Sequence, residues 1–217
     1  SPGLALWWKA DASDMTFTAD PDYPNGIDTW TDSANGYDAV SGATPHDKPT
    51  FVPGVLNGHG VVRFDGVSVQ DFEVGHVEEL GGVSGGTTDQ LTVFVVGRQS
   101  PQECDPTNTF VNAAYADGAG NYPANRYMWG LERNNDSDSQ RAYAQTAMGE
   151  IGDPPVFAES APGTAGTGFH VFSFVWAEDD SLSFFKDGEL VQASPGADAV
   201  PFYHEYLWIG SPGGYHG

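Results

Sequence analysis

The apolar residues of this chain come in short runs, and none of the runs repeats at helical spacing. No window of about a dozen residues keeps apolar residues at i, i+3, i+4 and i+7 without an intervening glycine or proline. Glycine (28) and proline (15) make up about a fifth of the 217 residues, and they separate runs rich in β-branched and aromatic side chains. An all-β fold is therefore expected, with helices no longer than a turn.

Strands are expected at residues 4–9, 60–64, 69–74, 91–98, 109–115, 126–132, 141–146, 169–176, 181–186, 189–193 and 206–209. Alternation is clearest over 170–176, where Phe172, Phe174 and Trp176 share one face that we expect to pack inward. The dipeptide Asp187-Gly188 lies between two runs and fits a two-residue hairpin turn. Because no linker or shift in composition divides the chain, the pattern predicts one domain with two sheets packed face to face.

Long loops are expected at residues 10–26, 75–90, 116–125 and 147–168, and the last of them exceeds the usual length of a loop without structure of its own. Three interpretations stay open for it. Residues 147–168 could form a functional loop, a pair of short strands that the pattern does not reveal, or a mobile segment.

Acidic residues outnumber basic residues by 30 to 8, which sets the formal net charge at −22. Binding to nucleic acid or to anionic lipid depends on clustered Lys and Arg, so the charge excludes both partners. No run of about 20 apolar residues is present, so insertion into a membrane is not expected. Two interpretations of the acidity remain, namely a solvated surface suited to saline surroundings and the binding of divalent cations.

The amino-terminal residues bear on where the protein is located. The chain opens on Ser-Pro-Gly, which fits a protein whose leader has been removed, and we expect an extracellular or cell-surface location.

Cys104 has no second cysteine for an intramolecular disulfide or a cysteine-based zinc site. It is also a poor nucleophile, because Glu103 and Asp105 on either side disfavour its thiolate.

A series of short motifs runs through nearly the whole chain, at residues 4–13, 30–38, 48–51, 56–58, 61–66, 92–96, 184–188 and 207–210. Their order and spacing resemble the bacterial laminin-G-like branch of the concanavalin-A-like jelly rolls. In the second motif, Trp30 precedes a loop that looks like the family's Asp-x-Ser-Gly-Asn-Gly-x-Asp, with Ala34 where glycine is usual. The resemblance implies an antiparallel jelly-roll sandwich of two sheets.

The carboxyl-terminal end departs from the family pattern. In the family, a segment like residues 209–217 is normally followed by a further strand beside the first one. We therefore expect residues 1–217 to form a single laminin-G-like domain that lacks its final strand. Two explanations stay open: the protein is longer than this sequence, or a strand from another chain fills the open edge.

Asp32, Asn35 and Asp38 form a candidate metal site. They offer three oxygen side chains at a spacing of three, and Gly36 permits the tight turn that brings them together. The resemblance implies a structural Ca²⁺ in this region in many relatives. The alternative is a loop in which these side chains bond their own backbone and need no metal.

A second group of candidates combines aromatic rings with polar side chains in the predicted loops. These ligand-binding candidates are Tyr122, Asn125, Arg126, Tyr127, Trp129 and Tyr203. Proteins bind sugars through flat rings against their C–H faces and through a few polar groups that hold the hydroxyls. The sequence therefore predicts a surface for a glycan or a cell-surface partner, unless these rings only cover the ends of the sandwich.

Catalysis has less support than binding. Sugar-cleaving enzymes need a pair of carboxyl groups, and no strand here carries two acids on one face. Glu132 is the only acid inside an aromatic strand.

We expect a non-catalytic extracellular adhesion module stabilised by Ca²⁺. The alternatives are a structural subunit of an extracellular filament or particle surface, in which copies of the chain contact one another, and a polysaccharide hydrolase or lyase whose acids come from different strands.

Overall fold

The computed structural model describes residues 3–65, 70–77, 80, 91–99, 107–114, 127–134, 137–144, 156–177, 181–195 and 206–210. Within these ranges the chain forms strands and two single-turn 3-10 helices, and no α-helix. The helices are η1 (Ala12–Asp14) and η2 (Pro45–Asp47). The strands are β1 (Met15–Phe17), β2 (Ile27–Trp30), β3 (Ala39–Ser41), β4 (Thr50–Leu56), β5 (His59–Arg63), β6 (Phe72–Glu73), β7 (Leu91–Gly97), β8 (Thr107–Ala114), β9 (Tyr127–Asn134), β10 (Ser139–Ala144), β11 (Val156–Glu159), β12 (His170–Trp176), β13 (Leu182–Lys186), β14 (Glu189–Ser194) and β15 (Tyr206–Ile209).

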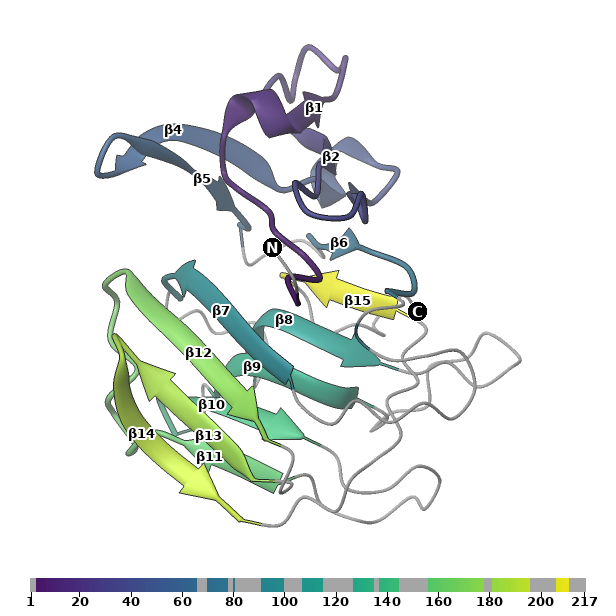
Figure 1. The fold of residues 1–217 in the computed structure, drawn as a ribbon. Coiled ribbons are helices and arrows are strands. Elements are labelled where there is room, and N and C mark those ends of the chain that lie inside the picture. Colours follow the sequence, from purple (N-terminus) through teal and green to yellow (C-terminus); the bar gives the residue numbers. More distant parts are fainter. Residues whose placement is uncertain are drawn as a thin grey trace.

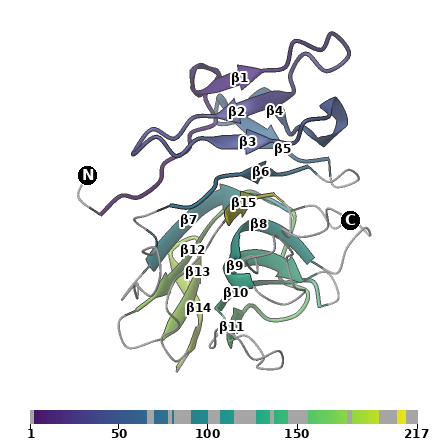
Figure 2. The same cartoon turned by 90° about the vertical axis from the view of Figure 1, so that its right-hand side faces the viewer.

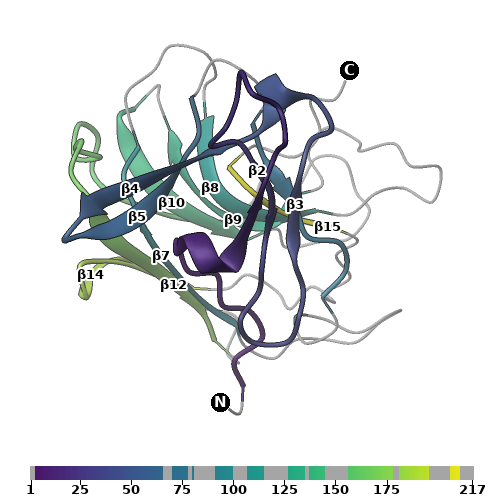
Figure 3. The ribbon, with the colours of Figure 1, turned by 90° about the horizontal axis from the view of Figure 1, so that it is seen from above.

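The strands form two main antiparallel sheets and a separate hairpin. The large sheet has the order β1-β2-β3-β6-β15-β8-β9-β10-β11, which Figure 2 shows from top to bottom. The small sheet has the order β14-β13-β12-β7 and packs against β8 to β11 (Figure 1). The β4–β5 hairpin crosses above the large sheet in Figure 3. Neighbours far apart in sequence, such as β6 beside β15 and β7 beside β12, are typical of a jelly roll, so the predicted all-β sandwich is confirmed.

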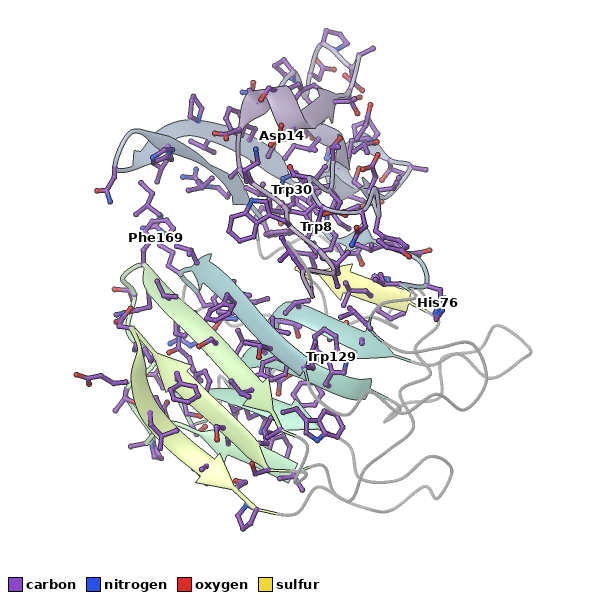
Figure 4. The ribbon with its side chains drawn as sticks, viewed as in Figure 1. Trp8, Asp14, Trp30, His76, Trp129 and Phe169 are labelled. Atoms are coloured by element: carbon purple, nitrogen blue, oxygen red, sulfur yellow. The ribbon has the colours of Figure 1, made fainter. Side chains whose placement is uncertain are left out.

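A large part of the core lies between the small sheet and strands β8 to β11. Phe172, Phe174 and Trp176 of β12 face it and are 0%, 0% and 4% exposed, as the alternation predicts. Trp129 and Leu131 of β9 approach from the large sheet, and the ring centroids of Trp129 and Phe174 are 5.6 Å apart. Figure 4 shows Trp129 between the two sheets. Aromatic rings from both layers therefore hold the sandwich together.

Side chains join the two sheets where β11 and β14 meet. The backbone N–H of Glu159 donates to Oε1 of Gln192 at 2.9 Å. The hydroxyl of Ser194 donates to the carbonyl oxygen of Phe157 at 2.6 Å. These bonds satisfy backbone groups that an edge strand leaves unpaired, and they hold β11 in place.

The amino-terminal segment differs from its prediction. Residues 4–9 are extended but form no strand. The Trp7 N–H donates to Oδ1 of Asp32 at 2.6 Å, and the Trp7 carbonyl accepts the N–H of Ser33 at 2.8 Å. Because these partners belong to a loop, the segment has no neighbouring strand with which to build a ladder.

Five strands, β1 to β4 and β11, have no clear signal in the sequence. Four of them are only three or four residues long, which is too short for alternation to be recognised. The remaining strand of the five, β4, contains Pro53 and Gly54, which usually mark a turn. An irregular register between Val52 and Leu56 accommodates both residues. Strand β11 lies inside residues 147–168, so that connection contains a short strand.

The predicted hairpin between β13 and β14 is confirmed. Asp187 and Gly188 form its turn with φ values of 53° and 83°, as a primed two-residue turn requires. The Asp187 carboxylate accepts the N–H of Val171 at 2.9 Å and lies 2.7 Å from Nδ1 of His170. The bond from Val171 and the contact with His170 lower the pKa of Asp187 below its ordinary value. The turn is thereby attached to the start of β12.

Replacing Gly188 with alanine is expected to lower the free energy of unfolding by about 1 kcal/mol, because glycine adopts the φ of 83° without strain and alanine does not. A Cβ at this position meets no atom within 4 Å, so the cost comes from the backbone alone. Gly75→Ala is the matched control, since Gly75 also has open space but no positive φ. Urea unfolding of both variants checks the prediction. Equal effects at the two positions would contradict it.

Candidate functional site

Asp32 holds the loop of residues 32–38 through a buried carboxylate that accepts backbone N–H groups. Its Oδ1 accepts those of Trp7 at 2.6 Å and Ala34 at 3.0 Å. Its Oδ2 accepts those of Asn35 at 2.8 Å, Gly36 at 2.9 Å and Tyr37 at 3.2 Å. These donors occupy the lone pairs of both carboxylate oxygens. Burial raises the pKa of the Asp32 carboxyl, but the backbone bonds, that of Asn35 first, lower it by more, so the net pKa lies below its ordinary value.

The other two candidate metal ligands belong to the same network. Nδ2 of Asn35 donates to the carbonyl oxygens of Leu4 at 3.1 Å and Ala5 at 2.9 Å. Oδ1 of Asp38 accepts the N–H of Asp32 at 3.0 Å. The loop thus adopts the backbone-bonded arrangement that the sequence left open as the alternative to a metal site. With its oxygens turned to N–H donors, the Asp32 carboxylate does not fit a Ca²⁺ ligand. Calcium binding stays a prediction that would depend on other oxygens of the loop.

The predicted ligand-binding residues have different outcomes. Tyr122, Asn125, Arg126 and Tyr203 lie outside the described residues. Tyr127 is the first residue of β9, and its side chain also lies outside what the structure describes. Trp129 is 1% exposed and packs on Phe174 in the core. Its prediction as a ligand-binding residue is corrected, because β9 turns its side chain toward the small sheet.

A row of charged side chains crosses the large sheet on the face that is turned away from the small sheet. In the register, Arg141 of β10 lies between Glu132 of β9 and Glu159 of β11. Because Leu131 faces the core, its neighbour Glu132 and the residues opposite it face outward. Nη2 and Nε of Arg141 are 2.5 and 2.6 Å from Oε1 of Glu132. Two acids from different strands therefore flank one guanidinium.

Phe157 of β11 supports the guanidinium from another side. Cζ of Arg141 lies 4.3 Å from the centroid of the Phe157 ring, which is a favourable cation–π distance. The side chains of Arg141 and Glu132 are 17% and 8% exposed, whereas Phe157 and Glu159 are half-buried. An acid and an aromatic ring thus restrict the orientation of the arginine, while the ring and the second acid remain partly accessible.

Glu159 lies among hydroxyl groups. Its Oε1 accepts hydrogen bonds from the hydroxyls of Ser137, at 3.1 Å, and Ser139, and Nδ2 of Asn134 is 3.5 Å away. These are the kinds of bond that a carboxylate makes with a sugar hydroxyl. We call Glu132, Arg141, Phe157 and Glu159 the outer-face site.

Sequence reasoning found only Glu132 among these four residues. Arg141 lies in an expected strand, but nothing in the sequence says which residues lie opposite it. Phe157 and Glu159 are two positions apart, the spacing of side chains on one face of a strand. This spacing is visible in the sequence. It does not by itself predict a strand, because β11 has only four residues and lies inside a long connection.

Two other features of the described residues concern metals and membranes. No group of three or more His, Cys, Asp and Glu side chains is placed there to hold a metal ion. The helices in the same ranges are too short and too polar for any of them to cross a membrane.

Comparison with known proteins finds likeness of fold alone. No protein-family model matches the chain, and no curated protein does either. A crystal structure of a mutant of HCR D/C VPI 5995 has a TM-score of 0.48 and 8% identity, and the match covers 98% of this chain but only 45% of that one. An endo-β-1,4-glucuronan lyase from the fungus Trichoderma reesei has a TM-score of 0.43 and 14% identity over 75% of this chain and 74% of its own. The Emp47p carbohydrate recognition domain has a TM-score of 0.41 and 17% identity over 92% and 87%.

These similarities are too low to carry an argument about function. The similar structures include a lyase and a carbohydrate recognition domain, so they do not separate catalysis from binding. The laminin-G-like branch in particular stays a prediction from the motifs. The functional argument therefore depends on the geometry of this chain's own residues.

Proposed function

We propose that this chain is a non-catalytic binding module, of the laminin-G-like type, that recognises a glycan through its outer-face site. The observation that carries the proposal is the row of Glu132, Arg141 and Glu159 beside the half-buried ring of Phe157. It combines, on one sheet face, a flat apolar ring with a fixed guanidinium and an accessible carboxylate. That combination suits a ligand with apolar C–H faces and many hydroxyls.

The proposed roles differ among the four residues. The Phe157 ring packs against the C–H face of a sugar, and Glu159 accepts hydrogen bonds from its hydroxyls. The N–H groups of Arg141 that do not point at Glu132 donate to a hydroxyl or a carboxylate of the ligand. Glu132 keeps the guanidinium in the binding orientation. A restricted arginine loses less conformational entropy when the ligand binds than a free one does.

Phe157→Ala and Glu159→Gln are each expected to weaken glycan binding at least tenfold while leaving the protein folded, which near-ultraviolet circular dichroism checks. A glycan array identifies the ligand, and titration calorimetry with that glycan measures the affinities. Phe94→Ala is the matched control, because Phe94 is 67% exposed on the small sheet and should leave binding intact. Retained affinity in both site variants would overturn the proposal.

The hydrolase or lyase alternative now has a specific acid pair, since Glu132 and Glu159 share a face although they come from different strands. The close ion pair with Arg141 favours an orienting role for Glu132 over proton transfer to a substrate. We expect the glycan that the array identifies to remain uncleaved after prolonged incubation with the protein. Cleavage that Glu132→Gln abolishes would show that the chain is an enzyme.

The acidic composition supports a place for this module outside the cell, in saline surroundings where ions screen its net charge of −22. A cell-surface protein that carries the glycan is the natural partner in that setting. The assembly alternative, in which copies complete one another by strand exchange, stays a prediction that sedimentation velocity can check.

A further inference from the structure

The outer face of the small sheet carries no charged side chain at its strand positions. Phe172, Phe174 and Trp176 point into the core, so the alternate positions of β12 and the residues paired with them point outward. The outward residues are Thr92, Phe94 and Val96 on β7, Val171, Ser173 and Val175 on β12, Ser183 and Phe185 on β13, and Leu190 and Ala193 on β14. We call these residues the apolar face.

The apolar face is open to solvent over much of its area. Phe94 is 67% exposed, Val96 59%, Leu190 58% and Val171 42%. In an antiparallel sheet, the face that does not pack on the core is normally polar. A chain with 30 acidic residues would be expected to place some of them here. A contiguous exposed apolar patch of this kind marks an interaction surface.

The size of the apolar face indicates what fits on it. Its two longest strands have seven residues each, which corresponds to a length of about 20 Å, and four strands span a width of about 15 Å. An α-helix is about 10–12 Å in diameter, and about 14 residues of helix cover 20 Å. The face therefore matches the footprint of one helix of about four turns.

A second copy of this chain fits the face less well. Pairing two such faces would bring together two chains that each have a net charge of −22. The end of the face where β13 and β14 meet carries both signs, since Glu189 pairs with Lys186 in the register and Asp187 contacts His170, so the net charge of the whole chain decides the preference. Charge therefore favours a basic occupant.

We propose that the apolar face docks a basic amphipathic helix from a partner protein, with the apolar stripe of the helix on Phe94, Val96 and Leu190 and its Lys and Arg residues attracted by the net charge of −22. This surface lies on the opposite side of the sandwich from the outer-face site. The two proposals are independent, and either can fail without the other.

The probe for this proposal is a labelled peptide of 15 residues, made of leucine and lysine with the leucines at helical spacing. A scrambled peptide of the same composition has the same charge but no apolar stripe. Fluorescence anisotropy is expected to show at least tenfold tighter binding of the amphipathic peptide to the full chain. Added salt should weaken both peptides by a similar factor.

The variant with Phe94→Thr and Leu190→Thr is expected to lose at least tenfold in affinity for the amphipathic peptide and to keep its weak affinity for the scrambled one. The matched control carries Val40→Thr and Val55→Thr, which replace exposed strand residues on other sheets, and should bind as the wild type does. Threonine preserves strand propensity, so both variants are expected to fold, and near-ultraviolet circular dichroism checks this.

Four results would overturn the proposal. Equal binding of the two peptides would mean that charge alone attracts them. Unchanged binding of the amphipathic peptide by the Phe94 and Leu190 variant would mean that the peptide binds elsewhere on the chain. No binding of the amphipathic peptide would mean that the face does not dock such a helix. Sedimentation of the wild type as a dimer that the same variant abolishes would assign the face to a second copy of the chain.

Discussion

Trp129→Ala is expected to lower the free energy of unfolding by about 3–5 kcal/mol, which is the usual cost of truncating a large aromatic side chain in a core. Trp129 is 1% exposed, and its ring lies 5.6 Å from that of Phe174 across the sandwich. Its removal leaves a cavity between the sheets, where the neighbouring β-strands are tied by their ladders and relax only in part. Urea unfolding at neutral pH measures the change.

Trp7→Ala is the matched control, because it removes the same side chain from a position that is 51% exposed. Its effect on the free energy of unfolding is expected to stay below about 1 kcal/mol. The pair of variants also distinguishes a core role of Trp129 from the ligand-binding role that the sequence predicted. A Trp129→Ala protein of unchanged stability that loses glycan binding would restore the earlier prediction.

Asp32→Ala is expected to destabilise the protein by about 2–4 kcal/mol. Each hydrogen bond to a charged acceptor contributes about 1.5–3 kcal/mol, and bonds that share one carboxylate do not add fully. The substitution leaves the five backbone N–H groups that Asp32 accepts, which are partly buried, without their acceptor. Asp38→Ala is the control, since Asp38 accepts a single bond, from Asp32, and should cost about 1 kcal/mol. Equal losses from the two variants would contradict this account.

The Asp32 contribution also depends on pH in a defined direction. Because the pKa of Asp32 is lower in the folded protein than its ordinary value near 3.9, the charged carboxylate stabilises the fold at every pH above that value. The contribution is lost as the pH falls below about 4 toward the folded-state pKa. Asp32→Asn has no such titration, so the gap in unfolding midpoint between wild type and variant should narrow between pH 5 and pH 2.

The same melting measurements test calcium binding. If a Ca²⁺ ion binds the native loop, the unfolding midpoint of the wild type rises with calcium relative to chelator at fixed ionic strength. Because N–H donors surround the Asp32 carboxylate, we expect that this carboxylate does not bind Ca²⁺ and does not raise the unfolding midpoint in calcium. A rise that Asp38→Ala removes and Asp32→Asn keeps would locate a site on other oxygens of the loop.

Local patterns were enough to predict parts of the fold. The alternation over residues 170–176 identified β12 and its buried face, and Asp187-Gly188 identified the turn after β13, because both signals are contained in a few consecutive residues. Strands β1, β2, β3 and β11 carry no such signal. They are strands because a strand on the other side of a loop supplies their hydrogen bonds, and the few residues of the short strand do not themselves identify that partner.

The sequence by itself determined the class of fold, since short β-branched and aromatic runs between glycines and prolines leave no alternative to a sandwich of sheets. It also determined the acidity from which we expect no nucleic-acid partner. Only the tertiary structure decided that Trp129 points into the core and that Arg141 lies between two acids. Strand register sets which residues face each other, and a shift of one residue reverses every side chain. That register depends on contacts between strands, which no single segment encodes.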